Sequence, residues 1–198
     1  GNEWWKDTSF KKLDIRDYVI RGENNIYMAR KFYQSPNVYR ILFGEGVYET
    51  ELNQLTYDVE LESIYLLGDF GVVSESDYTE LPRNGIRTAG PFVMVEKPKV
   101  LQAGDFTRQG LCFFSGKLDL TREVQINKQP GKRVILDFGR VRTPLFKLYV
   151  NNELVSKFMW EPFQADITDY VQEGSNEIRV EIYSSNRNLL GPHHHIDG

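Results

Sequence analysis

The sequence has one cysteine, three histidines and no long apolar segment. Cys112 stands alone in 198 residues, which excludes an internal disulfide. No apolar run approaches the roughly 20 residues that a membrane helix needs, and no signal peptide opens the chain. We therefore expect neither a disulfide-stapled scaffold nor a membrane partner.

Basic clusters are also scarce. The formal net charge is -4, and lysine and arginine gather only in short groups such as Lys11-Lys12 and Lys132-Arg133. A nucleic-acid-binding protein needs a basic face to neutralise phosphates, so no nucleic acid partner is expected. No acid-rich loop has the spacing of a calcium site, and we expect no cofactor.

No segment keeps an apolar stripe of helical period over three turns. Apolar and polar residues instead alternate with period two in 118–124, 146–150 and 178–182, and 134–136 is a short apolar run. Asn151-Asn152 tolerates the left-handed backbone of a hairpin turn. This pattern predicts an all-β fold, an antiparallel β-sandwich whose few helical turns lie chiefly at 15–20 and 167–172.

One motif occurs twice. Asp, Ile, Asp, Tyr, Val, Gly, Asn and Ile recur in register in 14–26 and 166–178. Asp14 or Asp166 can accept a backbone N–H, and an acid three residues later can complete a capping box. Gly22 or Gly174 permits the positive φ that ends the turn. The motif predicts a helical turn leading into a strand, in two related domains, and the early start of the first copy predicts that its preceding part is missing.

The first half is less regular. The segments 26–33, 38–43 and 61–67 are predicted strands, and 74–99 is polar and rich in turn residues apart from a strand at 92–95. We therefore predict domains at 1–100, a partial β-sandwich related by duplication, and at 101–198, a complete one. The alternative is a composite sandwich built from strands of both halves.

From residue 104 onward the chain resembles a known family. The matching segments are 104–110, 113–116, 118–124, 134–139, 148–152, 160–163, 166–171, 174–178 and 186–192. In this order they resemble the galactose-binding-like jelly roll that accompanies glycoside hydrolases, notably the sugar-binding domain of family two and the ancillary domains of α-L-rhamnosidase-like enzymes. The resemblance implies a bacterial parent enzyme, periplasmic or extracellular, whose catalytic carboxylates lie on another domain. That catalytic domain is the expected partner, with carbohydrate as a second.

Aromatic and polar side chains near these segments are candidates for saccharide binding. Sugar rings stack on aromatic faces, and amides, guanidinium groups and acids hydrogen-bond to hydroxyls. The candidates are Trp160, Asn151, Glu153, Arg187 and Asn188. Packing of Trp160 over the end of the sandwich is the favoured alternative, and Trp4 and Trp5 are either a platform or pieces of a core. A single shallow subsite predicts a dissociation constant near millimolar.

The only histidines are the consecutive His193, His194 and His195. A structural zinc site needs four convergent ligands, and Cys112 is the only other soft ligand, so no metal site is predicted. We interpret the histidines as an interdomain or ligand loop, with a flexible chain end as the alternative.

Asp58, Glu60 and Glu62 alternate along one segment. Glycoside hydrolysis needs two carboxylates roughly 5–10 Å apart, one of them with a raised pKa, and this spacing allows it. A solvated face is the favoured interpretation, so no catalytic residue is predicted. We therefore predict a non-catalytic accessory domain of a bacterial glycoside hydrolase that supports the catalytic domain. The alternatives are an autonomous carbohydrate-binding module and a hydrolase with its own carboxylate pair.

Overall fold

The computed structural model describes residues 3–60, 64–82 and 85–190. The chain divides into two compact units, Gly1–Leu66 and Leu67–Gly198, and each unit is described by itself. The larger unit holds most of the strands, and 30% of the chain is strand against 13% helix. The prediction of a mainly β protein with few and short helices is therefore confirmed.

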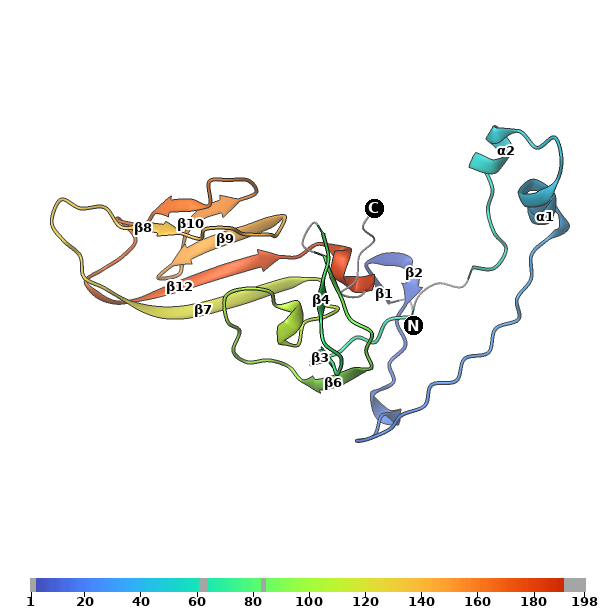
Figure 1. Cartoon of the computed structure of the whole chain (residues 1–198), viewed down its shortest axis with the longest axis horizontal. Helices are drawn as coiled ribbons and strands as arrows, with labels where there is room; N and C mark the ends of the chain where they lie inside the picture. The colour runs from blue at the N-terminus through green and yellow to red at the C-terminus, as the bar shows by residue number, and fades with distance from the viewer. Residues whose placement is uncertain (1–2, 61–63, 83–84, 191–198) are drawn as a thin grey trace. The chain divides into compact units, whose positions relative to one another are not determined.

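A four-stranded antiparallel sheet forms the centre of the larger unit. Its strands follow the order β10-β9-β12-β7 and run side by side in Figure 1. They are β7 (Lys117–Ile126), β9 (Leu145–Val150), β10 (Glu153–Phe158) and β12 (Gly174–Tyr183). β12 pairs along its whole length with β7 and over six residues with β9. The predicted strands at 118–124, 146–150 and 178–182 all lie in this sheet.

A second sheet of two short strands, β8 (Ile135–Asp137) and β11 (Gln164–Asp166), shares a hydrophobic core with the first. Phe146, Leu148 and Val150 alternate along β9 with half-buried residues, as a strand with one face in a core requires. Phe163, Ala165, Ile167 and Val171 complete the core from the other side. The buried side chains of residues 146–171 therefore join the two sheets.

The tight turn between β9 and β10 has the predicted backbone. Asn151 and Asn152 have φ of 49° and 69°. These left-handed conformations are tolerated best by Gly and Asn, which explains the Asn pair at a two-residue hairpin. The turn is part of the site described below, because the Asn151 side chain connects it to β12.

The described residues between 67 and 116 form two small antiparallel sheets and a loop. The sheets are β3 (Phe70–Ser74) with β6 (Phe92–Glu96) and β4 (Thr79–Glu80) with β5 (Ile86–Arg87), followed by the turn η3 (Thr107–Gln109). Cys112 is fully buried, and its Sγ lies 2.9 Å from the Tyr78 hydroxyl. Burial and this contact raise the pKa of Tyr78 to about 12.

In its described residues, the smaller unit has one hairpin and three short helical elements. They are β1 (Trp4–Trp5) with β2 (Asp7–Lys11), then η1 (Arg16–Tyr18), α1 (Pro36–Phe43) and α2 (Glu49–Asn53). Trp5 packs against Phe10 and Tyr65, with ring centroids 6.5 Å and 5.3 Å away. The indole of Trp5 therefore belongs to a local aromatic cluster.

The predicted strands of this unit are not formed among the described residues. The segment 26–33 is extended and unpaired, drawn in Figure 1 as a trace leading to α1, and 61–63 lie outside the described residues. The strand predicted at 38–43 is wrong, because the chain is helical from Pro36. A proline fits the first helical turn, and buried Val38 and Ile41 are spaced for one helix face. At eight residues, α1 is too short to show a sustained stripe.

The two copies of the repeated motif fold into the same turn. In the second copy, Asn176 Oδ1 accepts the Gln172 N–H at 2.8 Å, and Asn176 Nδ2 donates to the carbonyls of Gln172 and Gly174, both at 2.9 Å. Gly174 has a φ of 94°. Thr168 N–H donates to Asp166 Oδ1 at 3.0 Å.

The first copy repeats each of these contacts. Asn24 Oδ1 accepts the Ile20 N–H at 2.9 Å, and Asn24 Nδ2 donates to the carbonyls of Ile20 and Gly22 at 2.8 and 2.9 Å. Gly22 has a φ of 107°, and Arg16 N–H donates to Asp14 Oδ1 at 3.1 Å. The predicted shared turn is confirmed. The strand that should follow forms only after the second copy, as β12.

One detail of that prediction is wrong. The capping box is not formed in the first copy, where η1 has no side-chain cap, because Asp14 accepts the N–H two residues on and makes an Asx turn. The helical turn predicted at 167–172 is a single turn, in which Tyr170 N–H and Val171 N–H both donate to the Ile167 carbonyl, at 3.0 and 3.1 Å.

No helix within the described ranges is long and apolar enough to cross a membrane.

Candidate functional site

The predicted saccharide-binding residues lie at two opposite ends of the four-stranded sheet. Asn151 and Glu153 are at the hairpin that joins β9 to β10, whereas Trp160 follows the other end of β10. Six residues of extended chain separate these ends, which is about 20 Å. Arg187 and Asn188 lie in η4 (Asn186–Leu190), beyond the end of β12 that pairs with the start of β9. The five residues therefore do not form one site.

Asn151 has a structural position. Its Nδ2 donates to Tyr170 O and Asn176 Oδ1, both at 2.9 Å, and its Oδ1 accepts the Glu177 N–H at 3.0 Å. The amide therefore connects the hairpin to the second repeat copy. Each half-buried polar atom of this group has a protein partner.

Trp160 is 72% exposed. The interpretation that it packs over the end of the sandwich is therefore wrong. An exposed indole offers a flat apolar face with one N–H donor, which is the form of a sugar-stacking platform. Glu153, at the opposite end of β10, is exposed as well.

Arg187 and Asn188 open onto a groove of about 1620 Å³ in the larger unit. The volume exceeds the 300–1,000 Å³ of ordinary small-molecule sites. Its floor is the inner face of β7 and β12 and the end of β8, with the apolar side chains Leu118, Leu120, Phe138, Ile178, Val180 and Ile182. The small second sheet packs on β9 and β10, and this leaves the inner side chains of β7 to line the groove.

The walls of this groove are mainly cationic, although the whole chain has a net charge of -4. Six basic residues line it, namely Lys99, Arg108, Arg122, Arg140, Arg142 and Arg187, against three acids, Glu80, Asp105 and Asp119. Arg108 pairs with Glu80 and Asp105 at 3.2 and 3.4 Å. The other four arginines form no ion pair within the described residues. We call the surface that contains these four the arginine groove.

Sequence reasoning found Arg187 and Asn188 but missed Arg122, Arg140 and Arg142. The spacing of Arg140 and Arg142, which follow β8, could have indicated a shared site. Residues two apart in an extended segment point to the same face. The register that brings Arg122 to the same groove depends on the long pairing of β7 with β12.

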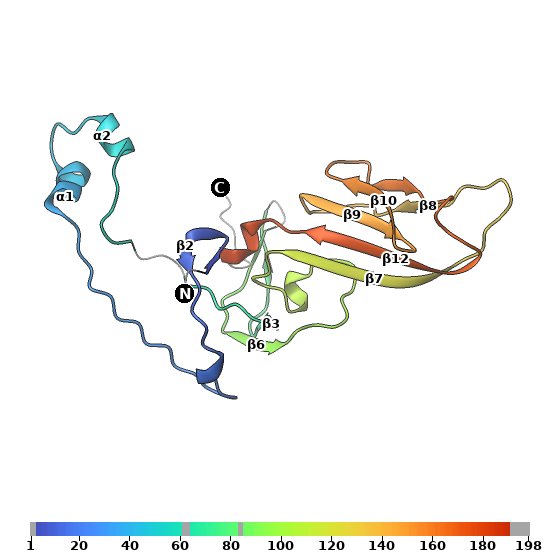
Figure 2. The ribbon, with the colours of Figure 1, turned by 180° about the vertical axis from the view of Figure 1, so that it is seen from behind.

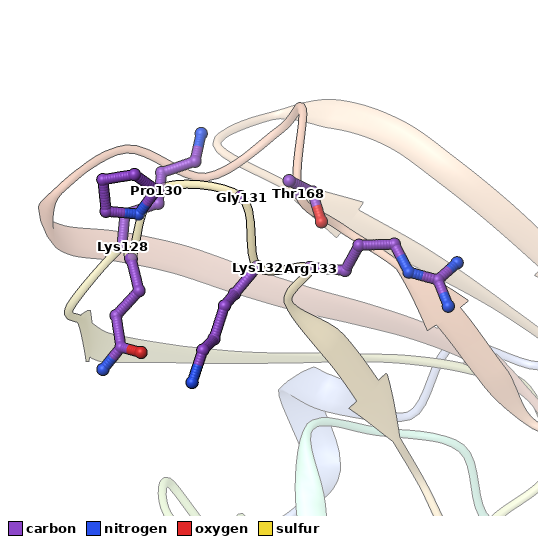
Figure 3. A pocket seen from close by; sticks show the side chains of 7 residues that line it. Lys128, Pro130, Gly131, Lys132, Arg133 and Thr168 are labelled. Atoms are coloured by element: carbon purple, nitrogen blue, oxygen red, sulfur yellow. The ribbon is translucent and has the colours of Figure 1, made fainter.

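A shallower hollow of about 430 Å³ lies under the loop that contains Lys128, Lys132 and Arg133. Figure 3 shows the side chains of Lys132 and Arg133 pointing in different directions. Lys128 Nζ donates to the Val171 carbonyl at 2.9 Å, and Arg133 pairs with Asp166 at 3.5 Å. Because Lys128 and Arg133 already have protein partners, this loop has fewer cations free of a hydrogen bond or ion pair among the described residues than the arginine groove.

The outer face of the same sheet has a closed network of charges. Glu181 on β12 is 6% exposed and accepts from Lys117 Nζ at 2.8 Å and from Lys147 Nζ at 2.7 Å. Hydrogen bonds from Lys117, Lys147 and Tyr183 lower the pKa of Glu181 to about 2. Arg179 stacks over the Tyr149 ring at 3.7 Å. Since every member of this network is engaged, we interpret it as a structural connection across β9, β12 and β7.

The structure shows few contacts for the remaining candidate residues. Asp58 Oδ2 accepts the Ser35 N–H at 2.8 Å, and Glu62 and His193–His195 lie outside the described residues. Trp4 is 51% exposed. Within the described ranges, no three histidine, cysteine or acidic side chains converge as a metal site would require.

Comparisons with known proteins give a partial likeness. No family model matches the chain, and no curated protein matches it. A rhamnosidase from Novosphingobium sp. PP1Y is similar at 20% sequence identity and a TM-score of 0.37, over 66% of this chain and 12% of that chain. A β-D-glucuronidase of Dictyoglomus thermophilum is similar at 22% identity and a TM-score of 0.33, over 59% of this chain and 18% of that chain. An FMN-binding β-glucuronidase from Facaelibacterium prausnitzii L2-6 is similar at 19% identity and a TM-score of 0.30, over 59% of this chain and 18% of that chain. The chain spans less than a fifth of each of these proteins. At such TM-scores the likeness carries no functional argument.

Proposed function

We propose that this chain is a non-catalytic accessory β-sandwich of a bacterial glycoside hydrolase, of the galactose-binding-like jelly-roll type. It supports the catalytic domain of a periplasmic or extracellular parent enzyme and contacts an acidic saccharide in the arginine groove. The ordered series of motifs from residue 104 onward supports the family. The groove supports the ligand class.

The single observation that carries the ligand class is a group of four arginines that form no ion pair with any described residue and lie beside an apolar floor. Arg122, Arg140, Arg142 and Arg187 are exposed and line one groove. A guanidinium group has the planar fork that matches a carboxylate in a bidentate pair. The apolar floor suits the C–H faces of sugar rings, and Asn188 suits hydroxyls. A sugar chain with carboxylate groups satisfies all three features.

Two described carboxyl groups, Asp166 and Glu181, are not suited to act as the acid of a glycosidase. A glycosidase needs one acid whose pKa is raised toward neutrality. Hydrogen bonds lower the pKa of Asp166 and of Glu181. These acids have the environment of ion pairs and turns, which keeps them charged and unable to donate a proton at neutral pH.

The second candidate function is an autonomous carbohydrate-binding module, and the exposure of Trp160 favours it. Such a module would place its sugar on the indole and not in the groove. The two candidates therefore differ in which substitution abolishes binding.

The test is an NMR titration of the whole chain with neutral and uronic-acid oligosaccharides. We expect acidic oligosaccharides to shift amide resonances of residues around Arg140 and Arg142 with a dissociation constant near 1 mM, a binding free energy of about -4 kcal/mol. The double variant Arg140→Gln and Arg142→Gln should weaken binding at least tenfold. Raising the salt concentration should do the same, because exposed charges are screened.

The matched control is Arg133→Gln, which removes an arginine outside the groove. It should leave the titration unchanged. Micromolar binding of neutral sugars that Trp160→Ala abolishes would support the binding module instead. Release of product from aryl glycosides by the purified chain would support a hydrolase.

A further inference from the structure

The inner face of β7 holds one residue that departs from its pattern. Side chains alternate along a strand, and the register with β12 identifies those that face the core, because Leu118 pairs with Ile182 and Ile182 pairs with the buried Phe146 of β9. The inward residues of β7 are Leu118, Leu120, Arg122, Val124 and Ile126. Position 122 is therefore charged where the inward residues before and after it are apolar.

The neighbours of Arg122 across the sheet are apolar as well. Arg122 pairs with Ile178 of β12, and Ile178 pairs with Val150 of β9, which is fully buried. Arg122 itself is exposed and lines the arginine groove, and no acid among the described residues pairs with it. β7 is the edge strand of the sheet, with β12 on one side only, as Figure 2 shows. An apolar residue at position 122 would continue the row that Val150 and Ile178 begin.

This departure from the local pattern is typical of a binding position. Proteins give up stability where a residue serves a function, and such residues are the ones that break the rules of their strand or helix. A guanidinium group pairs best with a planar anion such as a carboxylate. Because Leu118 and Leu120 line the groove beside Arg122, a ligand that pairs with the guanidinium group must also present an apolar surface.

Arg122 differs from the other three arginines of the groove in the rigidity of its support. Its backbone lies within the ten consecutive paired residues of β7. Arg140 and Arg142 lie in the irregular segment between β8 and β9, and Arg187 lies in the short helical turn η4. A group on a strand is held more precisely than a group on a loop. Arg122 is therefore suited to select a ligand by geometry, and the loop arginines to attract negative charge from a distance.

We propose that Arg122 is the specificity-determining residue of the arginine groove, and that its guanidinium group pairs with the carboxylate of a uronic acid whose ring lies on Leu118 and Leu120. This inference rests on the proposed function, because an acidic saccharide must enter the groove. It adds the residue that reads the charge and the sugar unit that is read. Side chains two positions apart on one face of a strand are about 7 Å apart, which matches a carboxylate joined directly to a sugar ring.

The first experiment compares a uronic-acid trisaccharide with its methyl ester, which has the same rings and no charge, in NMR titrations of the whole chain. We expect the free acid to bind at least about tenfold more tightly than the ester, as a charge-assisted pair implies. Arg122→Gln should reduce this preference to about threefold or less. Arg122→Lys keeps the charge but loses the planar fork, and should give an intermediate preference. The control Arg133→Gln, outside the groove, should keep the full preference.

The same titrations locate the sugar ring. Methyl groups of Leu118 and Leu120 should give intermolecular nuclear Overhauser effects to the ring protons of the free acid. Leu154 is the control, because it is 43% exposed on β10 and does not line the groove. Contacts at Leu154 and none at Leu118 or Leu120 would overturn the proposal.

The second experiment separates binding from folding with Arg122→Leu, which completes the apolar pattern of β7. We expect the thermal midpoint to rise by about 2 °C and the preference for the free acid to be lost. A fall of the midpoint by a similar amount would show that Arg122 supports the fold, and would overturn the proposal.

The outcomes distinguish this inference from the function on which it rests. If Arg140→Gln with Arg142→Gln weakens binding of the free acid and Arg122→Gln keeps the tenfold preference, the role of Arg122 is overturned and the acidic saccharide stands. If neither trisaccharide binds, or if both bind equally to the unmodified chain, the ligand class is overturned together with the role of Arg122.

Discussion

The two copies of the repeated motif make the same turn in opposite surroundings. Asn24 and Asn176 hold their turns with equivalent hydrogen bonds to the residues four and two positions before them. Asn24 is exposed, whereas Asn176 is 1% exposed and leads into a paired strand. The turn is therefore specified by local sequence, since side-chain-to-backbone bonds within five residues need no partner. The strand requires neighbours, because a lone strand is not stable in water.

The largest difference between the copies is expected at the isoleucine that follows the first aspartate. Ile167 is 2% exposed and part of the core, whereas Ile15 is 37% exposed. Ile167→Ala should lower the free energy of unfolding by about 2–5 kcal/mol, through lost burial and the cavity left behind. Ile15→Ala should change it little. Urea denaturation of the two variants checks this, and equal losses would show that the first copy is also packed.

The asparagines should differ next. Asn176→Ala leaves the Gln172 N–H and the Asn151 amide without the part-buried partner that both bind, at a cost of about 1–3 kcal/mol. Asn24→Ala removes the corresponding hydrogen bonds of the first copy. Because these bonds are exposed, water can replace each of them, and the loss of stability should be smaller. Thermal unfolding should separate the two variants clearly. A matching shift for Asn24→Ala would contradict the exposed position of the first copy.

The glycines sharpen the comparison, because both have positive φ and neither would bring a new Cβ within 4 Å of another atom. Gly174→Ala should therefore cost only the backbone strain of a left-handed residue, about 1 kcal/mol, in global stability. Gly22→Ala carries the same strain in a segment that can relax alone. It should alter local hydrogen exchange and leave the unfolding midpoint almost unchanged.

The smallest expected effect is in the acid titration of the two aspartates. The hydrogen bonds from Arg16 lower the pKa of Asp14 from 3.8 to about 2, and those from Thr168 lower the pKa of Asp166. Any stabilisation is thus present above pH 3.8 and lost as the pH falls through the folded-state pKa. Carbon-detected NMR titration should show Arg16→Ala returning the pKa of Asp14 toward 3.8 and leaving Asp166 unchanged.

Sequence reasoning succeeded where the signal is local or periodic. The period-two strands of the second half, the positive φ of Asn151 and both repeat turns were predicted from residues within a few positions of one another. It failed at 38–43, where an eight-residue helix shows too few turns for its period to be distinguished from a strand. It also missed that Trp160 and Asn151 lie at opposite ends of β10, which depends on where that strand begins and ends. It missed that Arg122 joins Arg140 and Arg142, because the register of β7 against β12 decides this.

The two edge strands of the four-stranded sheet are the places where another chain could pair with it. β7 and β10 are the edge strands, and an unpaired edge is a template for adding a foreign strand. β10 has a register shift between Leu154 and Ser156, which interrupts a straight pairing edge. β7 is ten residues long and regular, and Lys117, Asp119 and Arg122 place alternating charges along it. We therefore expect that replacing these charges with threonine converts this edge into a site of sheet extension.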